Sequence, residues 1–77
     1  MQNKLILPEL GEGIVSATVV EWLVKEGDAV AIDDDVVEIA TDKATFNVSA
    51  VCDGKVKQIL AKSGEEVKIG GILAIIE

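Results

Sequence analysis

Short apolar runs rich in β-branched residues alternate with turn signals along the whole chain. The turn signals are Pro8 with Gly11 and Gly13, Gly27-Asp28, Asp33-Asp34-Asp35, Asp42-Lys43, Asp53-Gly54, Ser63-Gly64 and Gly70-Gly71. No stretch keeps the 3.6-residue apolar period of an amphipathic helix. Closely spaced strands separated by turns are typical of a sandwich or barrel, so we predict an all-β domain.

The chain contains an internal repeat. Residues 19–32, VVEWLVKEGDAVAI, resemble residues 56–69, VKQILAKSGEEVKI, at a constant offset of 37 residues. A strand-turn-strand unit of this size cannot bury its apolar face alone, so we predict two similar halves that share one core. Gly27 recurs as Gly64, which indicates a backbone with positive φ, or a close approach, at equivalent turns.

The apolar spacing inside the repeat departs from strict strand alternation. Val19 and Trp22, and likewise Val56 and Ile59, lie three positions apart. Residues that face one side of a regular strand lie two positions apart. An extra residue in each strand explains the difference, so the spacing predicts a β-bulge in both halves.

Composition limits the domain to one small unit without histidine chemistry. A chain of 77 residues suffices for a single domain. Trp22 and Phe46 are its only aromatic residues; we expect Trp22 in the core and Phe46 near the base of a hairpin. With one cysteine, Cys52, and no histidine, the chain offers no internal disulfide and no cysteine or histidine metal site. We therefore predict neither a catalytic residue nor a metal site.

Charge is distributed unevenly. The net charge is −7, and residues 9–42 hold ten acidic residues against the single lysine Lys25. Phosphate backbones require clustered basic residues, so nucleic acid is excluded as a partner. No apolar run approaches the roughly 20 residues of a membrane span, so a membrane partner is not expected either. The acidic half is either a solvated face or a recognition surface for a basic partner.

Lys43 directly follows this acidic half, in the polar step between two strand-like runs. If a two-fold axis relates the halves, the counterpart of the Asp42-Lys43 turn is the gap between the chain termini. The lysine then lies at the end of the domain opposite both termini. An exposed lysine is most often a solvated charge, and a Schiff-base lysine needs a desolvated site that a turn tip does not offer. Covalent attachment through an amide at Nζ is the remaining alternative.

The segment EIATDKAT around Lys43 resembles the lipoyl-lysine motif of 2-oxo acid dehydrogenase acyltransferases. LPELGEGI (7–14), EWLVKEGDAV (21–30), DGKV (53–56) and SGEEVKIGGILAIIE (63–77) are similar to segments of the same family at the matching distances. The resemblance covers essentially the whole chain. It implies a barrel-sandwich hybrid, a flattened β-sandwich of two small antiparallel sheets with internal quasi-two-fold symmetry.

The resemblance also implies a carrier function. Lys43 would bear lipoic acid in amide linkage. A thiamine-diphosphate-dependent dehydrogenase would acylate that arm, an acyltransferase domain would transfer the acyl group to coenzyme A, and dihydrolipoyl dehydrogenase would reoxidise the arm. Asp42 and Ala44 are expected to fix the turn and to identify the lysine for a lipoylating enzyme. The expected dehydrogenase contact is the loop Glu9, Leu10, Gly11, Glu12, Gly13 and Ile14.

Several alternatives stay open at this point. LPELGEGI favours a pyruvate or branched-chain complex, whereas SATVVEW also resembles the 2-oxoglutarate type. A biotinyl carrier has methionine on both sides of its lysine, where this chain has Asp42 and Ala44. A glycine-cleavage lipoyl carrier, which is longer and has a different motif, and an unmodified acidic interaction module are the other candidates.

The resemblance also implies a domain organisation and a cellular compartment. We expect residues 1–77 to be one monomeric lipoyl domain, the N-terminal part of a longer multidomain acyltransferase. We expect this domain in the bacterial cytoplasm, with the mitochondrial matrix as the alternative compartment.

Overall fold

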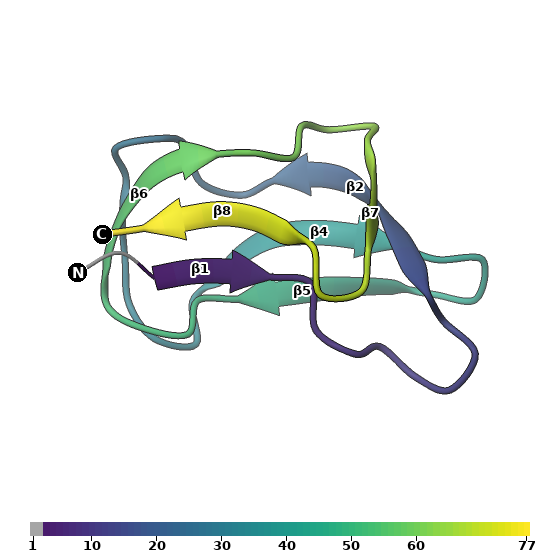
Figure 1. The fold of residues 1–77 in the computed structure, drawn as a ribbon. Coiled ribbons are helices and arrows are strands. Elements are labelled where there is room, and N and C mark those ends of the chain that lie inside the picture. The colour runs from purple at the N-terminus through teal and green to yellow at the C-terminus, as the bar shows by residue number, and fades with distance from the viewer. Residues whose placement is uncertain (1–2) are drawn as a thin grey trace.

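The computed structural model describes residues 3–77, in which every regular element is a β-strand (Figure 1). Met1 and Gln2, which belong to the expected domain, lie outside the described residues. The strands are β1 (Asn3–Ile6), β2 (Ser16–Trp22), β3 (Ala29–Val30), β4 (Asp35–Ala40), β5 (Thr45–Ser49), β6 (Gly54–Ile59), β7 (Glu66–Lys68) and β8 (Ile72–Ile76). Their short lengths follow from the closely spaced turn residues.

Two four-stranded sheets form the domain, with strand orders β1-β8-β6-β3 and β5-β4-β2-β7. All pairings between neighbouring strands are antiparallel. One order becomes the other when each strand is exchanged for its counterpart: β1 for β5, β8 for β4, β6 for β2 and β3 for β7. This confirms the predicted all-β fold of two small antiparallel sheets with internal quasi-two-fold symmetry.

The repeated turns connect the two halves. The Gly27 amide donates to the Val56 carbonyl at 2.7 Å, and the equivalent Gly64 amide donates to the Val19 carbonyl at 2.7 Å. Gly27 has φ of 94° and Gly64 has φ of 91°. The predicted positive φ at both glycines is therefore confirmed, and each turn is held by a strand of the opposite half.

Both predicted bulges are present. The register between β2 and β4 shifts between Val19 and Glu21. The register between β6 and β8 shifts between Val56 and Gln58. The extra residue in each strand accounts for the three-residue apolar spacing read from the sequence.

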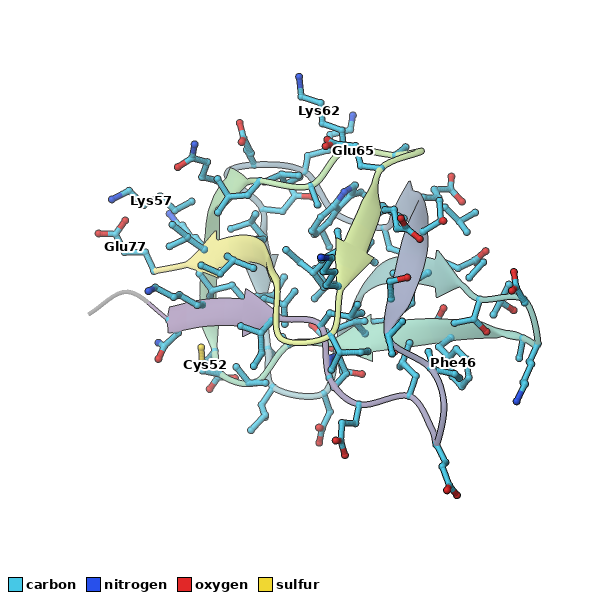
Figure 2. The ribbon with its side chains drawn as sticks, turned by 45° about the vertical axis from the view of Figure 1, so that its right-hand side comes forward. Phe46, Cys52, Lys57, Lys62, Glu65 and Glu77 are labelled. Carbon is cyan, nitrogen blue, oxygen red and sulfur yellow. The ribbon has the colours of Figure 1, made fainter. Side chains whose placement is uncertain are left out.

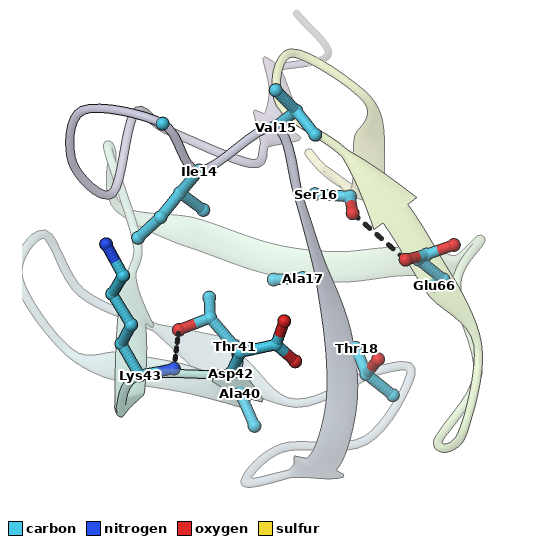
Figure 3. Close-up of a pocket in the computed structure, with 11 residues that line it drawn as sticks. Ile14, Val15, Ser16, Ala17, Thr18, Ala40, Thr41, Asp42, Lys43 and Glu66 are labelled. Carbon is cyan, nitrogen blue, oxygen red and sulfur yellow. Dashed lines mark hydrogen bonds between the residues drawn. The ribbon is translucent and has the colours of Figure 1, made fainter.

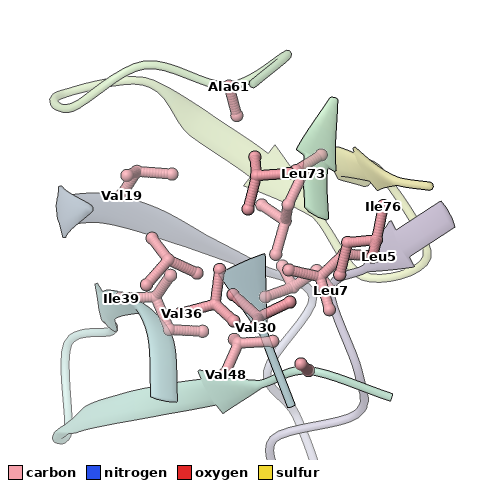
Figure 4. Close-up of a cluster of buried hydrophobic side chains, with 14 of the residues drawn as sticks. Leu5, Leu7, Val19, Val30, Val36, Ile39, Val48, Ala61, Leu73 and Ile76 are labelled. Atoms are coloured by element: carbon pink, nitrogen blue, oxygen red, sulfur yellow. The ribbon is translucent and has the colours of Figure 1, made fainter. Parts of the chain in front are cut away.

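The core lies between the sheets and consists of small aliphatic side chains (Figure 4). Among the described residues no buried side chain is polar or charged. Burial of each valine, leucine or isoleucine side chain stabilises the fold by about 1.5–3 kcal/mol relative to exposure. Trp22 packs against this core and donates from Nε1 to the Ala61 carbonyl at 2.7 Å. The buried residues are Leu5, Leu7, Ala17, Val19, Val30, Val36, Val37, Ile39, Val48, Ala50, Val56, Ala61, Leu73, Ala74 and Ile76.

The connection between β1 and β2 is the main departure from the internal symmetry. It comprises residues 7–15, whereas the equivalent connection between β5 and β6 comprises only residues 50–53. Leu7 and Ala50 still occupy equivalent positions, because their carbonyls accept from the amides of Gly70 and Asp33 at 2.8 and 2.9 Å. The extra length therefore follows Leu7 and forms a loop that its symmetry mate lacks.

The two ends of the molecule differ. Asn3 pairs with Ile76, so both chain ends lie at one end of the domain, and the β4–β5 hairpin projects from the other (Figure 1). Phe46 lies at the hairpin end, and Lys57 forms an ion pair of 3.7 Å with Glu77 at the terminal end (Figure 2). With extents of 33 × 20 × 17 Å, the domain is elongated.

Candidate functional site

The turn at the tip of the β4–β5 hairpin carries Lys43. Ala40 and Thr45 are the last paired residues of the two strands, and residues 41–44 form the turn. The Thr41 amide donates to the Ala44 carbonyl at 2.8 Å, which closes the turn. Lys43 is exposed and lies at the end of the domain opposite the termini, as the symmetry argument predicts.

The Thr41 hydroxyl holds the backbone of this turn. Its Oγ1 accepts from the amides of Lys43 and Ala44, both at 3.2 Å, and donates to the Ala44 carbonyl at 3.1 Å. Sequence reasoning missed Thr41 and gave the turn-fixing role to Asp42 and Ala44. The Asp42 carboxylate accepts no hydrogen bond within residues 3–77, so the Thr41 hydroxyl holds the turn instead, and the expected recognition role of Asp42 and Ala44 stays a prediction. Hydroxyl side chains close turns by such short-range bonds, so a threonine two residues before the lysine was the available signal.

The extended β1–β2 connection lies beside the hairpin (Figure 3). Within it the Ile14 amide donates to the Gly11 carbonyl at 3.2 Å, and Glu9 and Glu12 are exposed. Gly13 and Ile14 border the same surface groove as Lys43. The structure thus brings the predicted contact loop and the lysine together, while contact of this loop with a dehydrogenase stays a prediction.

The groove between the loop and the hairpin has a volume of about 330 Å³. Residues 13–15 of the connection, 16–18 of β2, 40–43 of the hairpin and Glu66 of β7 line it. Ile14 points toward the aliphatic part of Lys43 (Figure 3). At the far end Ser16 Oγ donates to Glu66 Oε2 at 3.0 Å. One wall is therefore apolar, and the opposite end is acidic.

The Lys43 amine is accessible at the hairpin tip. Among residues 3–77, the Lys43 ammonium makes no hydrogen bond and no ion pair, so an acyl group added at Nζ would disrupt no contact. No group of three or more Cys, Asp or Glu residues in this part of the chain could hold a metal ion. Residues 3–77 contain no helix that is long and apolar enough to cross a membrane.

Comparison with protein families gives a match over nearly the whole chain. A Biotin-lipoyl family model, described as "Biotin-requiring enzyme", matches residues 3–76. The dihydrolipoyllysine-residue succinyltransferase component of the 2-oxoglutarate dehydrogenase complex from Bartonella vinsonii subsp. berkhoffii is 42% identical over 77 residues. The match covers 100% of this chain and 19% of that protein, so the chain spans about a fifth of its relative's length.

Two further comparisons give similar results. The lipoamide acyltransferase component of a branched-chain alpha-keto acid dehydrogenase complex from Pseudomonas putida is 41% identical over 71 residues, covering 92% of this chain and 17% of that protein. The solution structure of the lipoyl domain of the 2-oxoglutarate dehydrogenase complex from Azotobacter vinelandii superposes with a TM-score of 0.76 at 34% identity. That superposition covers 96% of this chain and 94% of the solved domain, so the two have nearly the same extent.

Proposed function

Because this chain belongs to the biotin- and lipoyl-attachment family and is a lipoyl domain of the acyltransferase type, we propose that Lys43 is its lipoyl-attachment residue. One observation carries the proposal. Lys43 is exposed at the tip of the β4–β5 hairpin. Within the described residues, the symmetry counterpart of this hairpin turn is the gap between the end of β8 and the start of β1. The lysine therefore projects from the pole farthest from the chain ends.

The residues of the hairpin position the amine without enclosing it. The Thr41 hydroxyl fixes the backbone on the lysine side of the turn, and the β4–β5 ladder anchors the turn to the sheet. Lipoic acid in amide linkage supplies a dithiolane for redox and acyl-transfer chemistry. A flexible tether at the opposite pole would raise the local concentration of that group at a partner site to the millimolar range. In this proposal the domain acts as a carrier and is not itself catalytic.

The proposed parent assembly is a 2-oxoglutarate dehydrogenase complex. Support comes from the succinyltransferase relative and from the solved lipoyl domain, both of which belong to such complexes. This favours the alternative over the pyruvate or branched-chain assignment that LPELGEGI suggested. The branched-chain relative differs by only one percentage point in identity, so a direct assay must distinguish the types. The proposed partners are the thiamine-diphosphate-dependent dehydrogenase, the acyltransferase domain, dihydrolipoyl dehydrogenase and a lipoylating enzyme.

Intact-mass measurement tests the attachment site. The domain is incubated with lipoate, ATP and a lipoylating enzyme, and in parallel with biotin, ATP and a biotinylating enzyme. We expect one lipoyl adduct, mapped by peptide mass to Lys43, and no biotin adduct. Lys43→Arg keeps the charge and should take up no lipoate. A biotin adduct would support the biotinyl alternative, and the absence of both adducts would support an unmodified acidic module.

Reductive acylation tests the parent complex. The lipoylated domain is offered to purified 2-oxoglutarate, pyruvate and branched-chain dehydrogenases, each with its own 2-oxo acid. The mass increase of the domain is then followed over time. We expect the highest kcat/KM with the 2-oxoglutarate enzyme. Preferential acylation by either of the other two would refute the assignment while leaving the carrier function intact.

A further inference from the structure

We propose that the groove beside Lys43 is a resting site for the oxidised lipoyl arm, so that the arm alternates between a docked and a free position. The inference rests on the proposed attachment at Lys43. It goes further, because it assigns a binding function to Ile14 and Val15, which take no part in attachment.

The position of the groove supports this occupant. Lys43 itself lines the groove, so a group attached to its Nζ is held beside the cavity by a covalent bond. Such a tethered group reaches the site at a far higher effective concentration than a free ligand. The volume of about 330 Å³ is at the lower end of the range for small-molecule pockets. A thin alkyl chain that ends in a five-membered ring matches this size.

The chemistry of the walls supports a neutral, apolar arm. Ile14 faces the aliphatic part of Lys43 (Figure 3), and Val15 also lines the groove. Val15 is 75% exposed, the highest value among the exposed large hydrophobic residues in the described part of the chain. An apolar side chain in this position gains stability when an apolar ligand covers it. The carboxylates of Asp42 and Glu66 also line the groove and disfavour an anionic ligand such as coenzyme A.

The internal symmetry supplies a matched control. Val51 lies in the short β5–β6 connection, the counterpart of the connection that holds Val15, and is 60% exposed. This β5–β6 connection lies at the terminal end of the domain, away from the hairpin (Figure 1). Val15→Ser and Val51→Ser therefore remove the same apolar group from equivalent exposed connections at opposite poles. Only Val15→Ser should affect the arm.

Methyl NMR of the lipoylated domain tests the docked position. The unmodified, octanoylated and lipoylated forms are compared with ¹³C-labelled methyl groups. We expect shifts at the methyl groups of Ile14 and Val15 on lipoylation, and nuclear Overhauser contacts from the dithiolane ring protons to Ile14. Val15→Ser should remove these contacts and Val51→Ser should preserve them. Contacts confined to the lysine methylenes would overturn the proposal.

Chemical access to the disulfide gives a second readout that does not depend on any partner enzyme. If the arm is docked for half to four-fifths of the time, reduction by a small phosphine is slowed about two- to fivefold. We expect Val15→Ser to relieve that protection and Val51→Ser to retain it. Equal reduction rates in all three proteins would refute docking. Failure to form a lipoyl adduct at Lys43 would instead refute the proposed function, so the two failures are distinguishable.

Discussion

Replacing Gly27 and Gly64 by alanine tests whether the two halves of the domain are energetically as well as geometrically equivalent. The two glycines occupy the same turn of the repeat, with φ of 94° and 91°. A Cβ atom built at either position meets no other atom within 4 Å. No residue beyond the chain neighbours therefore obstructs a methyl group at either site, and the local backbone conformation is what opposes the substitution.

The expected loss can be worked out from that conformation. An L-residue held at positive φ costs about 1–2 kcal/mol relative to glycine. The two φ values differ by only a few degrees, so we expect the two losses to agree within about 0.5 kcal/mol. For a domain of this length each kcal/mol corresponds to about 4–8 °C in Tm. Each variant should therefore melt roughly 4–16 °C below the parent domain.

Urea unfolding followed by the fluorescence of Trp22 measures both free energies. This tryptophan is the only one in the chain and packs against the core, so its emission reports on global unfolding. A chemically synthesised chain with D-alanine at position 27 provides the control. D-residues favour positive φ, and alanine restricts the unfolded chain more than glycine does, so this variant should match or exceed the parent in stability.

Three outcomes would contradict this reasoning. If Gly27→Ala leaves the free energy of unfolding unchanged, the positive φ is not enforced by the fold. If the two alanine variants differ by more than about 1 kcal/mol, the hydrogen bonds that hold the two turns are not equivalent. If D-alanine destabilises as much as L-alanine, the side chain meets a steric obstacle that the structure does not show.

Four further substitutions test the hairpin and the core. Thr41→Val removes the hydroxyl that bonds the turn backbone, so it should lower the free energy of unfolding by about 1 kcal/mol and slow lipoylation. Asp42→Asn should change the free energy of unfolding by less than about 0.5 kcal/mol. Urea unfolding measures the stability of both variants, and adduct formation over time measures the rate of lipoylation. Trp22→Phe removes the donor to the Ala61 carbonyl and should lower Tm, which circular dichroism records; an unchanged Tm would show that water replaces that bond. Leu73→Ala should cost about 2–5 kcal/mol and leave much of the domain unfolded at 37 °C, and a native-like melting curve would place Leu73 outside the core.

Much of the fold could be predicted from local sequence patterns, because the same pattern of apolar residues and glycines occurs in both halves of the chain. The three-residue spacing at Val19 and Val56 predicted both bulges, and the recurrence of glycine at positions 27 and 64 predicted both positive φ values. The offset of 37 residues could not be extended to β1. The β1–β2 connection is longer than its counterpart, so the spacing between equivalent residues of the two halves changes after Leu7.

The site could be predicted only in outline. Symmetry placed Lys43 at the pole opposite the termini, and the structure confirms that placement. The role of Thr41 was missed because the hydroxyl acts through bonds to backbone atoms two and three residues away, and aspartate is the more frequent turn residue. The groove was also beyond prediction, since it arises where residues 13–15, β2 and the hairpin meet, and no single segment encodes it.

The pairing of Asn3 with Ile76 makes the order of the strands along the polypeptide partly arbitrary. A circularly permuted gene that joins the present ends by a short linker and opens the chain between residues 41 and 44 would retain every strand pairing. Such a protein should fold into the same sandwich, yet its new ends would emerge where the lysine now projects. The fold would then survive while the chain ends and the proposed attachment site would lie at the same pole, so the requirements of folding could be tested separately from those of the proposed carrier role.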